Sequence, residues 1–189
     1  MSQYDFEKML ATHCAPTLMG VKPANLISFK KSSSTNLLNF MERYEDLFLK
    51  FNIKMRVVCS CKNHFLIFVY RQDLLNQQLS KQEVRQYLMN QGYPKDFTLE
   101  EALDLMSERY KDQKCPNEIG VFLGYPLEDV IGFEKHKGSE CKYSGLWKVY
   151  GDVQVAKEMT KKFLYCRDLL CNKLETGLHM EQLLNYQFV

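Results

Sequence analysis

The sequence has no apolar run that approaches the roughly 18 residues needed for a membrane-spanning helix. Its first ten residues carry Asp5, Glu7 and Lys8 and lack the apolar centre of a secretory signal peptide. Charge of neither sign is in large excess, because 25 Lys and Arg residues face 23 Asp and Glu residues, for a net charge of +2. We therefore expect a soluble, cytoplasmic protein with no membrane partner.

Signatures of several functional classes are also missing. Basic residues occur only in short clusters such as residues 30–31 and 161–162, whereas a nucleic-acid-binding protein usually has a basic stripe. The chain contains no glycine-rich phosphate loop, no HExxH zinc motif and no Gly-x-Ser-x-Gly nucleophile elbow. These absences argue against nucleic acid as a partner and against the enzyme classes that those motifs mark.

The seven cysteines are odd in number and irregular in spacing, which predicts mostly free thiols in a reducing compartment. Cys59 and Cys61 alternate along a predicted strand and would lie on the same face of it. Two thiolates on one face can begin a zinc or iron–sulfur site, but a closed zinc site needs about four ligands, and no second pair has matching spacing. We therefore expect no metal and no other cofactor.

The length of 189 residues is typical of one domain, so we expect residues 1–189 to form a single compact domain. Apolar periodicity predicts a helix near residues 37–51 and a long helix over residues 153–174. Alternating and continuous apolar runs predict a strand at residues 26–29, a β-hairpin over residues 55–70, and strands at residues 119–123 and 143–150. Ser80 with Glu83, and Thr98 with Glu101, are spaced as capping boxes that begin two further helices.

These elements predict an α/β fold of the α+β-like kind, with one mixed sheet of about five strands flanked by helices. Residues 65–70 are apolar throughout and should form a central strand. The long C-terminal helix should pack on the sheet, against residues 65–70 and 119–123, through a stripe at helical spacing. The stripe comprises Ala156, Met159, Phe163, Cys166, Leu170 and Leu174.

Three segments carry a resemblance to a known family: HCAPTLMGVKPANL at residues 13–26, NEIGVFLGYPLEDVIGF at residues 117–133, and WKVYG at residues 147–151. In this order they resemble the bacterial family named Domain of Unknown Function 3793, over nearly the whole chain. The resemblance implies a bacterial origin and one compact domain, and it implies no activity. The family often has a histidine before the Glu-Ile-Gly segment, where this chain has Asn117.

Cys14 is the candidate nucleophile. It follows His13 in a segment with two prolines and a glycine, which predicts a shaped loop over residues 13–25 after a short helix at residues 3–12. A thiol that begins a helical turn beside a cation has a lowered pKa and is nucleophilic. A cysteine hydrolase or transferase would then use His13 or His136 as its base, with Asn117 as an orienting group. The alternative is that Cys14 is a small buried apolar side chain.

A second group of candidates consists of polar residues at the ends of predicted buried segments, where ligands of α/β sheets tend to bind. We expect these residues to surround a small anionic ligand or the loop of a protein partner, in a pocket formed by the 13–25 loop, the 118–129 segment and residues 147–150. The alternative is that they cap and pair with one another around the core. They are Lys22, Asn25, Arg71, Glu118, Tyr125 and Lys148.

Overall fold

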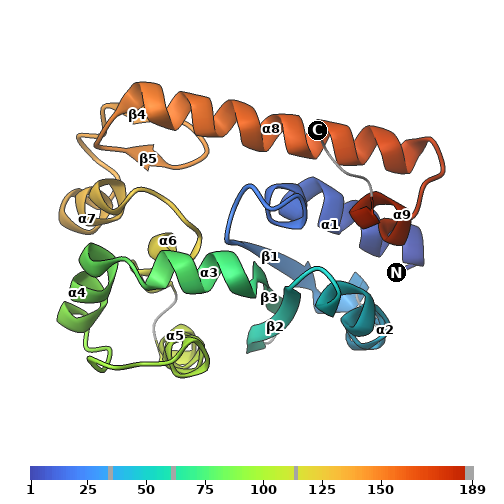
Figure 1. Ribbon diagram of the computed structural model, residues 1–189, viewed down its shortest axis with the longest axis horizontal. Helices are drawn as coiled ribbons and strands as arrows, with labels where there is room; N and C mark the ends of the chain where they lie inside the picture. Colours follow the sequence, from blue (N-terminus) through green and yellow to red (C-terminus); the bar gives the residue numbers. More distant parts are fainter. Residues whose placement is uncertain (34–35, 61–62, 113–114, 186–189) are drawn as a thin grey trace. The chain divides into compact units, whose positions relative to one another are not determined.

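The computed structural model describes residues 1–33, 36–60, 63–112 and 115–185. The chain divides into two compact units, one formed by residues 1–73 and 162–189 and the other by residues 74–161 (Figure 1). The chain passes from the first unit to the second within α3, Gln72–Leu79, and returns within α8, Val153–Glu175. A single domain over residues 1–189 stays a prediction, and the two units are described separately below.

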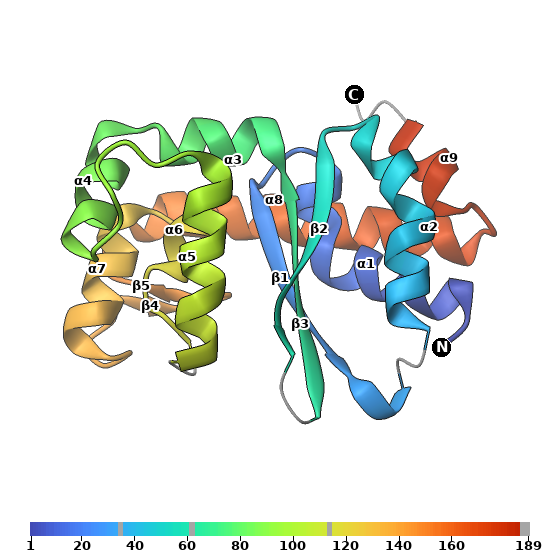
Figure 2. The same ribbon diagram turned by 90° about the horizontal axis from the view of Figure 1, so that it is seen from below.

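The first unit contains a three-stranded antiparallel sheet in the order β1-β3-β2 (Figure 2). Its strands are β1, Ala24–Lys30, β2, Ile53–Ser60, and β3, His64–Arg71. β2 and β3 are the predicted hairpin, with a register shift between Val57 and Cys59. The run of apolar residues in β3 correctly predicted the central strand, because a strand paired on both edges and packed on both faces has few positions for polar side chains.

Two helices pack on this sheet: α1, Gln3–Leu18, on β1 and β3, and α2, Leu37–Leu49, on β2. α1 begins at a capping box in which Ser2 and Asp5 exchange hydrogen bonds. The ring of Phe6 stacks on Phe40 of α2, with 5.3 Å between ring centroids. α2 confirms the helix predicted from its apolar period. A 3₁₀ helix at Lys31–Ser33 follows β1, and the short helix α9, Met180–Asn185, buries Met180 in the same core.

The structure corrects the loop predicted over residues 13–25, because α1 continues as a helix to Leu18. Pro16 lies inside the helix, although proline removes a backbone donor and usually ends one. The helix ends only two residues later, and Leu10, Cys14 and Leu18, spaced four apart, are all buried. Burial of this stripe stabilises the last turns more than Pro16 destabilises them, because most helical stability in proteins comes from packing.

The long C-terminal helix is confirmed as α8, and five of its six predicted stripe residues are buried, the exception being the half-buried Met159. Its predicted packing on the strand at residues 65–70 is wrong. In the first unit, α1 lies between α8 and the sheet (Figures 1 and 2). Thr12 of α1 reaches Cys171 of α8, with 3.7 Å between Oγ1 and Sγ. The sequence of α8 shows which face is buried, but not whether a strand or a helix covers it.

The second unit is mainly helical. After α3 it contains α4, Gln82–Asn90, α5, Leu99–Asp112, α6, Ile119–Phe122, and α7, Leu127–His136. The capping box of Thr98 and Glu101 is confirmed by reciprocal hydrogen bonds. The other predicted box is wrong, because the Ser80 hydroxyl donates to the carbonyl of Asn76, and α4 is preceded instead by Lys81.

Two predicted strands of this unit differ in the structure. Residues 119–123 contain α6 and no strand, since a short apolar run suits a buried helical turn as well as a buried strand. Residues 143–150 form a small antiparallel hairpin of β4, Tyr143–Ser144, and β5, Lys148–Val149. The described residues therefore contain five strands, as predicted, but in two separate sheets instead of one mixed sheet.

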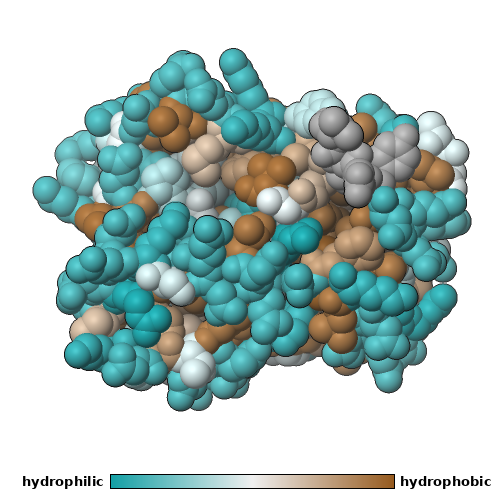
Figure 3. All heavy atoms as spheres, in the orientation of Figure 1, coloured by the Kyte–Doolittle hydropathy of each residue, from teal (hydrophilic) through white to brown (hydrophobic). Residues whose placement is uncertain are grey.

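Among the described helices, none combines the length and the apolarity that crossing a membrane requires. Figure 3 shows mostly hydrophilic residues on the visible face, with apolar residues in small patches between them. Some large apolar side chains are exposed, including Leu146 and Phe133 in the second unit.

Candidate functional site

Three predicted ligand-binding residues, Lys22, Asn25 and Arg71, belong to the first unit. Arg71 donates from Nη1 to the carbonyl of Leu18 at 3.2 Å, and its Nε lies 3.8 Å from an oxygen of Asp73. The hydroxyl of Thr17 donates to Oδ1 of Asn25 at 2.7 Å. Asn25 and Arg71 thus stabilise the end of α1, which agrees with the alternative that these residues cap and pair.

Cys14 and Lys22 are both buried, with exposed fractions of 0% and 4%. Burial raises the pKa of the Cys14 thiol to about 12, and the nearby Lys22 ammonium only partly opposes this rise. Burial likewise lowers the pKa of Lys22 to about 8. The nitrogen of Lys22 lies 5.4 Å from the centroid of the Phe163 ring. The thiol therefore lacks the lowered pKa and the accessibility that a nucleophile needs. The side chain of His13 is exposed and lies about 100° around the helix from that of Cys14.

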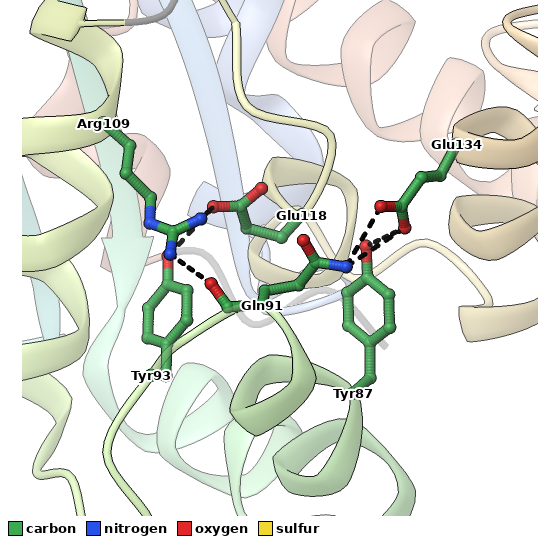
Figure 4. A network of polar contacts seen from close by, with 6 residues as sticks. All are labelled: Tyr87, Gln91, Tyr93, Arg109, Glu118 and Glu134. Carbon is green, nitrogen blue, oxygen red and sulfur yellow. Dashed lines mark hydrogen bonds and ion pairs between the residues drawn. The ribbon is translucent and has the colours of Figure 1, made fainter.

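The remaining predicted residues, Glu118, Tyr125 and Lys148, belong to the second unit. Glu118 is only 3% exposed, and its Oε1 lies 3.0 Å from Nη1 of Arg109 on α5. The hydroxyl of Tyr93 donates to the same oxygen at 3.5 Å, and the Arg109 guanidinium lies over the Tyr93 ring, 5.1 Å from its centroid. Glu118 is therefore paired within the unit (Figure 4).

The same polar network extends along α4 to α7 (Figure 4). Arg109 donates from Nη2 to the backbone carbonyl of Gln91, the C-cap residue of α4. The side-chain amide of Gln91 donates to Glu134 of α7 at 3.1 Å, and the hydroxyl of Tyr87 donates to Glu134 at 3.0 Å. The network ties α4, α5 and α7 to the segment that carries Glu118, and so fixes residues 117–119 in place.

Asn117 and Ile119, on either side of Glu118, form one wall of a cavity of about 470 Å³ in the second unit. Tyr125 and Trp147 form another wall, with their rings stacked at 4.8 Å between centroids and 21° between planes. Most of the lining side chains are apolar. They include Ile119, Leu123, Val130, Phe133 and Leu146.

Asp129 holds this aromatic wall in position. The indole Nε1 of Trp147 donates to one oxygen of Asp129 at 2.7 Å. The backbone amides of Tyr150 and Gly151 donate to the other oxygen, at 2.7 and 2.8 Å. The carboxylate is 3% exposed, and hydrogen bonds to both oxygens are what a buried anion requires.

Lys148 carries the positive charge among the described residues that line this cavity. The side-chain nitrogen of Lys148 donates to the hydroxyl of Ser144 at 2.9 Å, so the two side chains lie on the same side of the hairpin. The structure thus brings the 118–129 segment and residues 147–150 together around one cavity, with Tyr125 and Lys148 on its walls. Glu118 lies behind the wall, while its neighbours Asn117 and Ile119 line it.

The sequence does not mark Asp129 or Trp147 as individual site residues, although both lie in the segments predicted to form the pocket. A single Asp in the first turn of a helix resembles an ordinary favourable charge near a helix N-terminus. Trp147 is the only tryptophan of the sequence, and this was the one feature that could have marked it as a site residue.

A second, polar cavity of about 430 Å³ lies in the first unit. Glu7, 1% exposed, accepts a short hydrogen bond from the hydroxyl of Tyr44, and Nδ1 of His179 lies 3.2 Å from its other oxygen. These contacts join α1 and α2 to the start of α9. Arg43 and Lys50 line this cavity together with Asp46 and Glu181, so the charges around it are mixed.

No three His, Cys, Asp or Glu residues converge as metal ligands within the described part of the chain. The six cysteines within that part are free thiols, and Cys59 is half-buried on β2. Cys61, its predicted companion in the Cys-x-Cys motif, lies outside the described residues.

Comparisons with known proteins identify a family but no function. No curated protein and no solved structure matches the chain. The model of one family, described as protein of unknown function (DUF3793), matches residues 10–184. This range includes all three segments on which the resemblance rested, and the chain belongs to the DUF3793 family.

Proposed function

We propose that this protein binds a small molecule in the cavity of the second unit. The observation that carries the proposal is the cavity itself: about 470 Å³ lined mainly by apolar side chains, with a stacked aromatic pair and one amine. Small-molecule sites are typically cavities of about 300–1,000 Å³ with mostly apolar walls and a few polar groups that orient the ligand. We place this function in the bacterial cytoplasm, a reducing compartment that suits a protein with free thiols.

The alternative of a cysteine hydrolase or transferase is not favoured by a specific observation. Cys14 is buried within α1, and burial raises its pKa, whereas catalytic thiols are partly exposed and have lowered pKa values. Two of the predicted ligand-binding cations already have contacts within the first unit: Arg71 with Leu18 and Asp73, and Lys22 with the Phe163 ring.

A fluorescence titration tests the proposal directly, because Trp147 is the only tryptophan of the chain and lies in the cavity wall. A thermal-shift screen of metabolites and cofactors would select compounds, since a bound ligand stabilises the folded state by mass action. Each hit should change the emission of Trp147. The variant Asn117→Phe, which places a ring in the cavity, should abolish binding, while Asn90→Phe on the exposed face of α4 should not. Hits that bind both variants equally would show that the cavity is not the site.

A further inference from the structure

The aromatic wall of the cavity is ordered before any ligand arrives. The indole of Trp147 is fixed on one side by the Tyr125 ring, 4.8 Å away, and at its nitrogen by Asp129. Aromatic rings prefer offset-stacked or edge-to-face neighbours, and such pairs contribute beyond the burial of their area. A flat ring therefore gains more binding free energy from contact with this wall than a flexible aliphatic chain of the same size.

The charges of the cavity favour an anionic group on that ring. Both oxygens of Asp129 already accept hydrogen bonds from three N–H groups, of Trp147, Tyr150 and Gly151, and the carboxylate is buried. A cationic ligand would have to break these bonds in order to reach it. Lys148, in contrast, is a half-buried residue whose ammonium group donates to a neutral hydroxyl, that of Ser144, and this contact leaves its charge unneutralised.

We propose that the cavity binds a planar aromatic or conjugated carboxylic acid, with its ring against Trp147 and its carboxylate at the ammonium group of Lys148. This inference rests on the proposed function and adds the chemical class of the ligand. A carboxylate at Lys148 would form a charge-assisted hydrogen bond, which is about twice as strong as a neutral one. The apolar side chains of Val130 and Phe133 would cover the ring.

Four probes of the same length separate the contributions of ring and charge. They are cinnamate, its neutral amide cinnamamide, the saturated anion 3-cyclohexylpropanoate, and the cation cinnamylamine. In calorimetric titrations of the intact protein, cinnamate should bind about tenfold more tightly than cinnamamide, because a hydrogen bond to a charged group is replaced by a neutral one. It should also bind about fivefold more tightly than 3-cyclohexylpropanoate, which cannot stack.

Two variants assign these preferences to the residues. Lys148→Gln should abolish the difference between cinnamate and cinnamamide, while Lys135→Gln, an exposed lysine of α7 that does not line the cavity, should leave it unchanged. Ser144→Ala should keep the preference for cinnamate, since the ammonium remains. Circular dichroism spectra identical to that of the native protein would show that each variant is folded.

The ligand class is wrong if cinnamamide or cinnamylamine binds as tightly as cinnamate, or if Lys148→Gln keeps the preference. It is also wrong if none of the four probes produces heat or changes the emission of Trp147. These outcomes do not decide the proposed function, which fails separately if no hit of the metabolite screen requires the cavity.

Discussion

Replacing Arg109 by leucine tests whether the polar network of Figure 4 holds the second unit together. Arg109→Leu removes the cation 3.0 Å from the buried carboxylate of Glu118 and the donor to the carbonyl of Gln91. Breaking a buried ion pair by removing one partner costs about 3–5 kcal/mol, because it leaves an uncompensated buried charge. The Arg109 side chain is 22% exposed, so water can partly replace it, and we expect the lower end, about 3 kcal/mol.

The double variant Arg109→Leu/Glu118→Leu separates this effect from simple loss of contacts. With both charges removed, no buried carboxylate is left without a cation, and apolar replacement of a buried pair is often neutral. We therefore expect the double variant to be more stable than Arg109→Leu by about 2 kcal/mol. Lys111→Leu, an exposed substitution on the same helix, should change the stability by at most about 0.5 kcal/mol.

Urea unfolding followed by the emission of Trp147 makes the measurement, because this single tryptophan lies in the second unit. The reasoning is refuted if Arg109→Leu unfolds at the same midpoint as Lys111→Leu. It is also refuted if the double variant is no more stable than Arg109→Leu, since the cost would then not come from an unpaired Glu118.

Three further predictions concern the first unit and α8. Phe163→Ala should lower the free energy of unfolding by about 3–5 kcal/mol, as expected for an emptied aromatic core site, while Lys161→Ala on the exposed face should lower it by at most about 0.5 kcal/mol. Urea unfolding monitored by circular dichroism makes the comparison, and equal midpoints of the two variants would contradict the packing of α8. Iodoacetamide should label Cys14 at least about tenfold more slowly than the exposed Cys115 at pH 7.5, because the thiolate is the reactive form and burial raises the pKa of Cys14. Rapid labelling of Cys14 at pH 6 would restore the hypothesis that Cys14 is a nucleophile. In the folded state the pKa of Lys22 is lowered from 10.5 to about 8, so between pH 8 and 10.5 the unfolded chain holds a proton on Lys22 that the folded protein has lost. The contribution of Lys22 to stability should therefore rise by up to about 1.4 kcal/mol per pH unit over this range. Lys22→Met should lack this rise in urea melts at pH 8 and 10, and identical pH profiles of the variant and the native protein would show that the pKa is not lowered.

The sequence predicted the elements whose periodicity extends over many residues. α2 and α8 repeat their apolar residues over several turns, and β3 is apolar along most of its length, so each pattern agreed with one secondary structure. The four-residue helix α6 is too short for a period to be visible, and its apolar run predicts a strand instead. The end of α1 was missed because Pro16 is a strong local signal against a helix, and the burial that overrides it depends on the sheet and on α8.

The sequence predicted which segments would form the candidate site, but not which side chains would contact one another there. The 118–129 segment and residues 147–150 do meet at one cavity. The sequence could not show that Glu118 would be turned towards Arg109, because many acidic residues of a chain are candidates for each arginine and burial decides between them. The same holds for Asp129, whose role depends on backbone amides more than 20 residues further along the chain.

The three hydrogen bonds to Asp129 have a consequence for how quickly and at what entropic cost a ligand could bind. Ordering a rotamer-rich side chain at an interface costs about 0.5–1.5 kcal/mol of binding free energy. The indole of Trp147 is already held by its bond to Asp129, and the same carboxylate fixes the backbone where the hairpin leads into α8. A ligand would therefore meet a wall whose conformational entropy was lost when the chain folded. Its association would need no rearrangement of that wall, and the cost of ordering the indole would not be subtracted from the affinity.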